Sequence, residues 1–190
     1  MQTKCSDTAE TTTLSLLQTI KTELRAGMNG VASAAMRQSA DYRVNFGIEL
    51  PRLTDIASEF GKNHELAQAL WKESVRECRI LATIIQPAET MCQELADVWA
   101  EDIHTSEIAQ VASLNLFQYM QEAPVKSLQW VATDNEMLQL CGLCTAYHLL
   151  RRSQFDERQK AELTDQAHSL ADSDNIAIRR VARNITDWES

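Results

Sequence analysis

The sequence is poor in residues that interrupt helices or form strand turns. It contains three prolines and five glycines in 190 residues, and its one Asn-Gly pair lies between segments with helical rather than alternating apolar periodicity. No stretch approaches the roughly 20 apolar residues that span a bilayer. Five cysteines, an odd number, argue against a disulfide framework. These absences predict a cytoplasmic, all-α protein that forms a single domain over residues 1–190.

Positive charge is absent from a long central part of the chain. There is no lysine or arginine between residues 80 and 125, and the formal net charge of the whole chain is −9. Seven acidic residues fall in the same stretch: Glu89, Glu94, Asp97, Glu101, Asp102, Glu107 and Glu122. Their wide spacing predicts a solvated acidic face rather than a cation site, and such a face repels phosphates.

The three prolines, in contrast, are regularly spaced. Pro51, Pro87 and Pro124 lie 36 and 37 residues apart, and proline is accommodated in the first turn of a helix. A unit of about 35 to 40 residues with two helices has the size of a HEAT-type repeat. We therefore expect an α-α superhelix (solenoid) of HEAT-like repeats, preceded by N-terminal helices within residues 9–40. The expected repeats cover about residues 51–85, 87–122, 124–151 and 155–188.

The spacing of apolar residues predicts the individual helices. They cover about residues 9–26, 31–38, 51–60, 64–85, 137–150, 155–171 and 175–188. A bend is expected at Gly47, and a break in the fourth helix near Glu73. Met91, Leu95 and Val98 are expected to form a core stripe in the second repeat.

The segment from residue 45 to residue 85 contains a specific set of short motifs. They are Gly47-Ile48, Pro51-Arg52, Leu66-Ala67, Leu70-Trp71, Glu77 and Arg79-Ile80-Leu81-Ala82. In these residues the chain resembles the DNA alkylation repair enzyme family, alkylpurine DNA glycosylases built from HEAT-like repeats. Trp71 supplies a large area for burial and Glu77 can pair with an arginine, so these motifs support a fold rather than a chemistry.

The resemblance also implies a catalytic carboxylate. Glycosylases of this family are understood to stabilise an oxocarbenium sugar with an aspartate from a Trp-Asp-x-x-Asp motif. When the motif is aligned to this sequence without gaps from Trp99, Ser106 occupies its tryptophan position and Gln110 occupies its last aspartate position. The family's later arginine and tryptophan fall near Gln139 or Leu140, and near Asn184. A neutral glutamine cannot stabilise the cationic sugar, so the alignment does not identify a catalytic residue and that residue is unknown.

Two acidic residues near the motif are the remaining catalytic candidates. Asp102 and Glu107 could replace the missing aspartate only if their helix is rotated or shifted. The residues that the resemblance places at a DNA surface are basic: Arg37, Arg43, Arg52, Lys72, Arg76, Arg179, Arg180 and Arg183. For each of them the alternative is a solubilising charge or an intrachain ion pair.

Two further features have simple structural interpretations. Cys141, Cys144 and His148 share a helical face, but zinc needs a fourth ligand and cysteine is commonly buried, so we expect core packing. Trp130 and Trp188 are expected to be packing residues. We expect no cofactor and no bound metal.

Three functions remain open on these grounds. The first is a non-catalytic or weakly catalytic DNA-binding protein, whose partner is double-stranded DNA, damaged or branched DNA included. The second is a scaffold whose acidic face selects a basic protein partner. The third is an active glycosylase with a relocated carboxylate. No membrane is expected as a partner.

Overall fold

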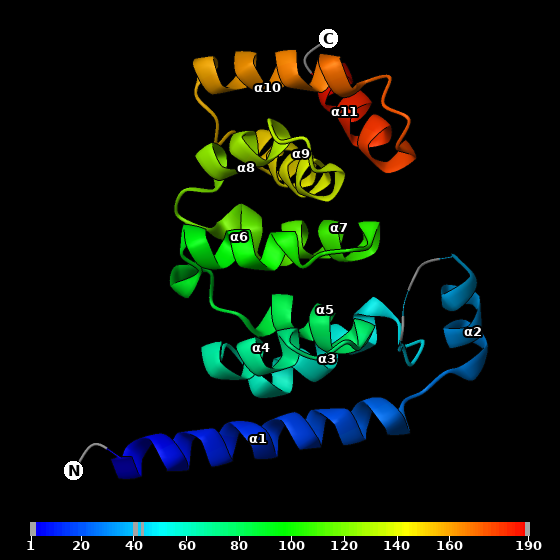
Figure 1. Ribbon diagram of the computed structural model, residues 1–190, viewed down its shortest axis with the longest axis vertical. Coiled ribbons are helices and arrows are strands. Elements are labelled where there is room, and N and C mark those ends of the chain that lie inside the picture. The colour runs from blue at the N-terminus through cyan, green and yellow to red at the C-terminus, as the bar shows by residue number, and fades with distance from the viewer. Residues whose placement is uncertain (1–2, 40–41, 43, 189–190) are drawn as a thin grey trace. The chain divides into compact units, whose positions relative to one another are not determined.

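The computed structural model describes residues 3–39, 42 and 44–188 (Figure 1). Every regular element among these residues is helical, which confirms the predicted all-α class, and one isolated β-bridge pairs Val44 with Val75. None of the described helices is both long enough and apolar enough to cross a bilayer. Contacts divide the chain into two compact units, unit 1 (Met1–Pro87) and unit 2 (Ala88–Ser190). That the two units act as a single domain stays a prediction.

Unit 1 is built from helices that pack around α5. Its described α-helices are α1 (Thr3–Ala26), α2 (Gly30–Ser39), α3 (Leu50–Phe60), α4 (His64–Trp71) and α5 (Arg76–Ile85). Helix α5 packs on α3 and α4, and α1 packs on α4. The side chains of Leu66, Leu70, Leu81 and Ile85 are buried. Residues 72–75 separate α4 from α5, so the predicted break near Glu73 is confirmed.

The bend expected at Gly47 is confirmed and requires glycine. Its φ is +70°, in the left-handed region that side chains disfavour. A Cβ atom at this position would lie 2.4 Å from the carbonyl oxygen of Asn29 and 2.5 Å from the backbone nitrogen of Ser33. The loop before α3 therefore passes directly against the start of α2, where only a residue without a side chain fits.

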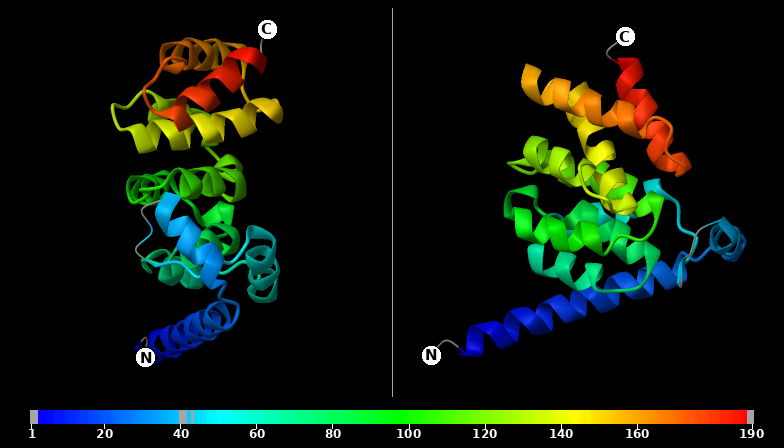
Figure 2. Two further views of the ribbon diagram at one scale, coloured as in Figure 1. Left: turned by 90° about the vertical axis from the view of Figure 1, so that its right-hand side faces the viewer. Right: turned by 45° about the horizontal axis from the view of Figure 1, so that its top comes forward.

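Unit 2 is built around one central helix, α9. Its described α-helices are α6 (Gln93–Glu101), α7 (Ser106–Asn115), α8 (Ala123–Val131), α9 (Glu136–Arg151), α10 (Glu157–Leu170) and α11 (Ile176–Trp188). Two 3-10 turns are present, η1 (Ala88–Thr90) and η2 (Phe117–Tyr119). Helix α9 packs on α7, α8 and α11, as the left view of Figure 2 shows for α11, and most of its side chains are buried as predicted.

Polar side chains set the starts of several helices in unit 2. Thr105 accepts a hydrogen bond from the backbone N–H of Ile108 at the start of α7. Asn135 caps α9 in the same way, and Asp156 and Gln159 form a reciprocal capping box at the start of α10. Each cap satisfies backbone N–H groups that have no partner within the helix.

Two expectations about the prolines and the second repeat were wrong. Pro51 and Pro124 lie in the first turns of α3 and α8 as predicted, but Pro87 is followed by η1, and α6 begins only at Gln93. Since Met91 lies before α6, it does not share a helical stripe with Val98, whose side chain is 60% exposed. The buried face of α6 is instead formed by Ala96, Trp99 and Ala100.

Candidate nucleic-acid interface

An ion pair in the interior of unit 1 joins α5 to the loop before α3. Glu77 is fully buried and accepts hydrogen bonds from the backbone N–H groups of Phe46 (3.0 Å) and Ile48 (3.3 Å). Arg76 is 3% exposed and donates to Glu77 (3.0 Å) and to the carbonyl oxygen of Ile48 (2.9 Å). Buried charges persist only when they are paired in this way. Arg76 therefore has a structural role, and its side chain is not on the surface where the sequence interpretation placed it.

The other predicted basic residues of unit 1 that the structure describes are on its surface. Arg37 is exposed and donates to the hydroxyl of Ser33 (3.0 Å). The Arg52 side chain is 54% exposed and lies 2.6 Å from the carboxylate of Glu23. Lys72 is exposed at the C-terminus of α4. Arg43 lies outside the described residues, so three surface cations of the predicted set remain in this unit.

The three C-terminal arginines do not form a free basic patch. Arg179 donates to the carbonyl oxygen of Ser173 (2.7 Å), and Arg183 donates to the carbonyl oxygen of Ala171 (2.8 Å). Arg183 also pairs with Asp172 (2.9 Å). Both side chains thus tie α11 to the turn after α10, although the Arg183 side chain is 55% exposed. Of the three, Arg180 is the one that is exposed and makes no such contact among the described residues.

The two units differ strongly in charge. Unit 1 contains 10 lysines and arginines and 10 aspartates and glutamates, whereas unit 2 contains 8 and 17. The whole formal net charge of −9 therefore belongs to unit 2. Affinity for DNA phosphates comes from cations that displace counterions, so unit 1 is the more favourable of the two for phosphate contacts.

The positions at which the resemblance expects catalytic side chains lie on α7, α9 and α11. Ser106 begins α7 and Gln110 is exposed one turn later. Gln139 is half-buried and donates to the carbonyl oxygen of Thr133 (2.7 Å), while Leu140 is fully buried. Asn184 is exposed on α11. Glu107 occupies the first aspartate position of the motif, whereas the side chains at the other expected positions are neutral.

The two substitute carboxylates are both open to solvent. Asp102 lies at the C-terminus of α6, where its side chain is 44% exposed and 3.9 Å from the ring of His104. Glu107 lies in the first turn of α7 and is half-buried. Water screens charges at such positions, so neither carboxylate has the enclosed setting that makes electrostatic stabilisation effective.

A third carboxylate, which the sequence analysis did not single out, lies beside aromatic rings. Asp97 of α6 accepts hydrogen bonds from Lys126 Nζ (2.8 Å) and from Trp130 Nε1 (2.8 Å) of α8. Trp130 is buried, as predicted, and meets the ring of Phe117 edge to face at 5.0 Å. Because Lys126 already balances the charge of Asp97, this group fixes α6 to α8 and supplies no unpaired negative field.

An aromatic and basic cluster lies at the C-terminal ends of α9 and α11. Trp188 was expected to be a packing residue, but its side chain is 53% exposed. Its ring meets Tyr147 edge to face, with centroids 6.5 Å apart and an interplanar angle of 83°. The guanidinium of Arg151 lies 5.9 Å from the centroid of the Tyr147 ring. The sequence signal for this cluster was the spacing of Tyr147 and Arg151, four residues apart on one helical face.

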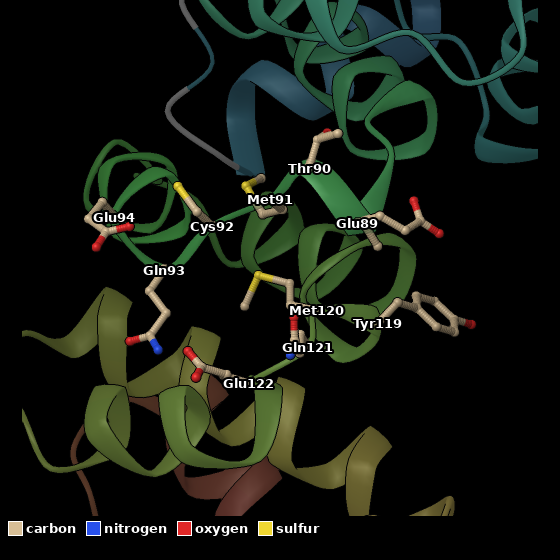
Figure 3. A pocket seen from close by; sticks show the side chains of 11 residues that line it. Glu89, Thr90, Met91, Cys92, Gln93, Glu94, Tyr119, Met120, Gln121 and Glu122 are labelled. Carbon is tan, nitrogen blue, oxygen red and sulfur yellow. The ribbon is translucent and has the colours of Figure 1, made fainter.

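Unit 2 also contains an acidic pocket of about 590 Å³ between η1, the start of α6 and η2. Figure 3 shows the side chains that line it, among them Glu89, Glu94 and Glu122. Hydrogen bonds from its own backbone N–H and from the Cys92 thiol lower the pKa of Glu94, so this carboxylate is ionised at neutral pH. The pocket is therefore suited to a cationic group rather than to a phosphate.

The cysteines of the predicted core face are buried. Cys141 and Cys144 lie inside unit 2, and burial raises the pKa of Cys144 to about 12 and also raises the pKa of Cys141. Burial, followed by the charge of Arg151, lowers the pKa of the half-buried His148. No group of three or more histidine, cysteine or acidic side chains in the described part of the chain is arranged to hold a metal ion.

Thiol labelling of the native protein should distinguish Cys92 from the buried cysteines. Cys92 is exposed, whereas the pKa values of Cys78 and Cys144 are raised to about 12. The reactive thiolate is therefore scarce at pH 8 in the buried residues, and Cys92 is expected to react at least tenfold faster than Cys78, Cys141 and Cys144. Mass-spectrometric peptide mapping of a time course with iodoacetamide measures these rates. Comparable rates at Cys92 and Cys144 would contradict the buried assignment.

Comparisons with known proteins place the chain in one family. A protein-family model described as DNA alkylation repair enzyme matches residues 20–162. One solved structure is described as representing a new family of proteins related to the HEAT-like repeat DNA glycosylases with affinity for branched DNA structures. It matches with a TM-score of 0.81 and 17% sequence identity, over 89% of this chain and 73% of that chain, which confirms the predicted HEAT-like fold. No curated protein matches the sequence. Since the family model spans most of the chain, this protein belongs to the DNA alkylation repair enzyme family.

Proposed function

We propose that this protein binds DNA, prefers branched DNA to linear duplex, and does not hydrolyse glycosidic bonds. The observation that carries the proposal is Gln110, exposed on α7 at the position where the family resemblance expects an aspartate. The solved structure with the same fold, a protein with affinity for branched DNA, supports the choice of ligand.

The chemistry of base release explains why Gln110 indicates a loss of glycosylase activity. Release of an alkylated purine leaves a cationic oxocarbenium sugar, and a preorganised negative charge stabilises that transition state. A neutral amide supplies no such charge, and loss of one preorganised electrostatic group typically lowers the rate by about 10²-fold or more. The charge of Asp97 is balanced by Lys126, and Asp102 is solvated, so neither replaces the missing aspartate.

The proposed phosphate contacts are the exposed cations of the predicted set. Arg37, Lys72 and Arg180 are exposed, and none of them pairs with a carboxylate among the described side chains. Arg52 is included because it can exchange its surface contact with Glu23 for a phosphate at little cost. Arg43 belongs to the same proposed set although it lies outside the described residues.

Binding to four DNA forms tests this function. Fluorescence anisotropy with a four-way junction, a fork, a nicked duplex and an intact duplex of matched composition is measured at about 50 and 200 mM salt. We expect the junction or the fork to bind at least tenfold more tightly than the intact duplex. Lys72→Ala should reduce the slope of log Kobs against log salt by about 0.9, the value for one phosphate contact.

A matched lysine provides the control for this measurement. Lys160 lies in the acidic unit and pairs with Glu157 at 2.7 Å, so Lys160→Ala should leave both affinity and salt slope unchanged. Absence of binding to every DNA form at about 50 mM salt would eliminate the proposed function, and equal affinity for junction and duplex would eliminate the preference for branched DNA.

A separate assay addresses catalysis. Incubation with alkylated DNA at high protein concentration should release no methylated purine above the uncatalysed background. Release that is abolished by Glu107→Gln or by Asp102→Asn would instead establish a glycosylase with a relocated carboxylate.

The acidic pocket favours a second candidate function, a scaffold for a basic protein. The pocket is lined by Glu89, Glu94 and Glu122 and lies in the unit that carries the whole net negative charge. Recovery of a stoichiometric protein partner from nuclease-treated lysate tests this candidate. The partner should be lost when the three glutamates are replaced together by glutamine. A partner that is lost on nuclease treatment of the unchanged protein would be bound through DNA, which would favour the DNA-binding function.

A further inference from the structure

The structure assigns a nucleobase-stacking site to Tyr147, Arg151 and Trp188, at the C-terminal ends of α9 and α11. Its ligand is an unpaired base of a branched or single-stranded DNA segment. This inference rests on the proposed DNA binding and specifies how unpaired nucleotides are held within the acidic unit.

Trp188 offers an open aromatic surface. More than half of its side chain is exposed, although its neighbour Tyr147 is partly buried in the α9–α11 contact. The two rings meet edge to face at 83°, so neither covers the other as a parallel ring would. A flat apolar ligand can therefore stack on Trp188 without displacing a side chain that already packs there.

Arg151 places a positive charge beside the two rings. Its guanidinium lies 5.9 Å from the Tyr147 ring, and it forms no ion pair with a described carboxylate. A nucleotide carries a phosphate within reach of its own base, so an exposed guanidinium next to a stacking platform suits that pairing of groups. His148 also borders Tyr147, with ring centroids 6.0 Å apart, but its lowered pKa keeps it neutral at pH 7.

The charge of unit 2 decides which part of the DNA binds here. With 17 acidic and 8 basic residues, this unit gains little from contacts to a chain of phosphates. Stacking of a base on an aromatic ring does not depend on counterion release and tolerates any base. Bases within a duplex are already covered on both faces by their neighbours, whereas an unpaired base has a free face. The site therefore selects unpaired nucleotides over intact duplex.

The first experiment replaces the platform and measures DNA binding. Trp188→Ala is expected to weaken binding to a fork with unpaired thymine arms, and to oligo-dT, by about tenfold. Binding to intact duplex should change less than twofold. Trp188→Phe should retain most of the affinity because it keeps an aromatic face. The effect of Trp188→Ala should be the same at about 50 and 200 mM salt, whereas the smaller effect of Arg151→Ala should fade as salt rises.

A second exposed aromatic residue of unit 2 provides the control. Tyr119 is 52% exposed and has the guanidinium of Arg152 4.7 Å from its ring centroid, but it lines the acidic pocket. Tyr119→Ala should leave binding to the fork and to oligo-dT unchanged. An equal loss in Tyr119→Ala and Trp188→Ala would show that any exposed ring suffices and would overturn the assigned site.

Tryptophan fluorescence gives a direct readout of the contact. Trp71, Trp99 and Trp130 are buried, so Trp188 is the tryptophan that a DNA base can reach among the described residues. Oligo-dT should quench part of the emission of the parent protein and none of the emission of Trp188→Ala. If the parent protein binds forks while Trp188→Ala binds them equally well, the stacking site is wrong and the proposed function stands. If the parent protein binds no DNA form, both the stacking site and the proposed function are wrong.

Discussion

Replacement of Glu77 by glutamine should destabilise unit 1 by about 3–5 kcal/mol, the range for breaking a buried ion pair. The carboxylate accepts the backbone N–H groups of Phe46 and Ile48 on its two oxygens and balances the charge of Arg76. Glutamine has one acceptor oxygen, so its amide NH₂ would face a backbone N–H. It would also remove the carboxylate charge that lies 3.0 Å from Arg76, which is 3% exposed.

Two measurements together check this result. Denaturant unfolding followed by circular dichroism gives the change in the free energy of unfolding. Hydrogen exchange in residues 44–48 shows whether the loss is centred on the loop that Glu77 holds. This local readout is needed because a chain with two compact units need not unfold in one two-state transition.

A glutamate of the same unit provides the matched control. Glu23 pairs with Arg52, whose side chain is 54% exposed, and Glu23→Gln should cost at most about 1 kcal/mol. Similar small effects for both substitutions would contradict the structural role assigned to the Arg76–Glu77 pair. That result would also reopen Arg76 as a candidate DNA contact.

Replacement of Gly142 by alanine is expected to destabilise unit 2 by about 1–3 kcal/mol, the cost of overpacking. In an ordinary helix interior the same change stabilises by about 1 kcal/mol, so the expected sign is reversed. A Cβ atom at Gly142 would lie 2.6 Å from the carbonyl oxygen of Ser127 and 2.7 Å from the backbone nitrogen of Val131. Both atoms belong to the backbone of α8, which cannot move aside as a side chain can.

Gly30 provides the comparison for this substitution. It begins α2, and a Cβ atom there would meet no atom within 4 Å. Gly30→Ala should therefore change the free energy of unfolding by less than about 0.5 kcal/mol. Denaturant unfolding of both variants, with hydrogen exchange in α8 and α9, measures the difference. A stabilised Gly142→Ala variant would mean that α8 and α9 do not approach as closely as the structure has them.

Much of the local structure was predictable because it depends on residues close together in the chain. The first turns of α3 and α8 follow from Pro51 and Pro124, and the start of α7 follows from Thr105. The bend at Gly47 was predictable for the same reason, although the close approach to α2 that demands glycine was not. The prediction of an α-helix start at Pro87 was wrong because a proline is also accommodated in the connection to a 3-10 turn.

The candidate site was less predictable, because adjacent charges in a sequence do not reveal their partners. In the sequence Arg76 has the pattern of a surface cation, but the loop from residue 44 to residue 48 covers it and brings backbone groups to Glu77. The sequence places Arg179 and Arg183 within one helical turn, yet both guanidinium groups donate hydrogen bonds to carbonyl oxygens of the turn before α11. Trp188 was expected to pack because tryptophan is large and apolar, but at the end of α11 it is 53% exposed.

The sequence by itself determined the helical class, most helix positions, the family motifs and the neutral residue at position 110, since each depends on residue type and short-range spacing. Only the tertiary structure decided which charges are buried in pairs, which cations remain open and where aromatic rings meet. The physical reason is that burial and pairing depend on contacts between segments far apart in the chain, such as Glu77 with Phe46 and Trp188 with Tyr147. Helical periodicity specifies the faces of each helix but not the neighbour that covers them.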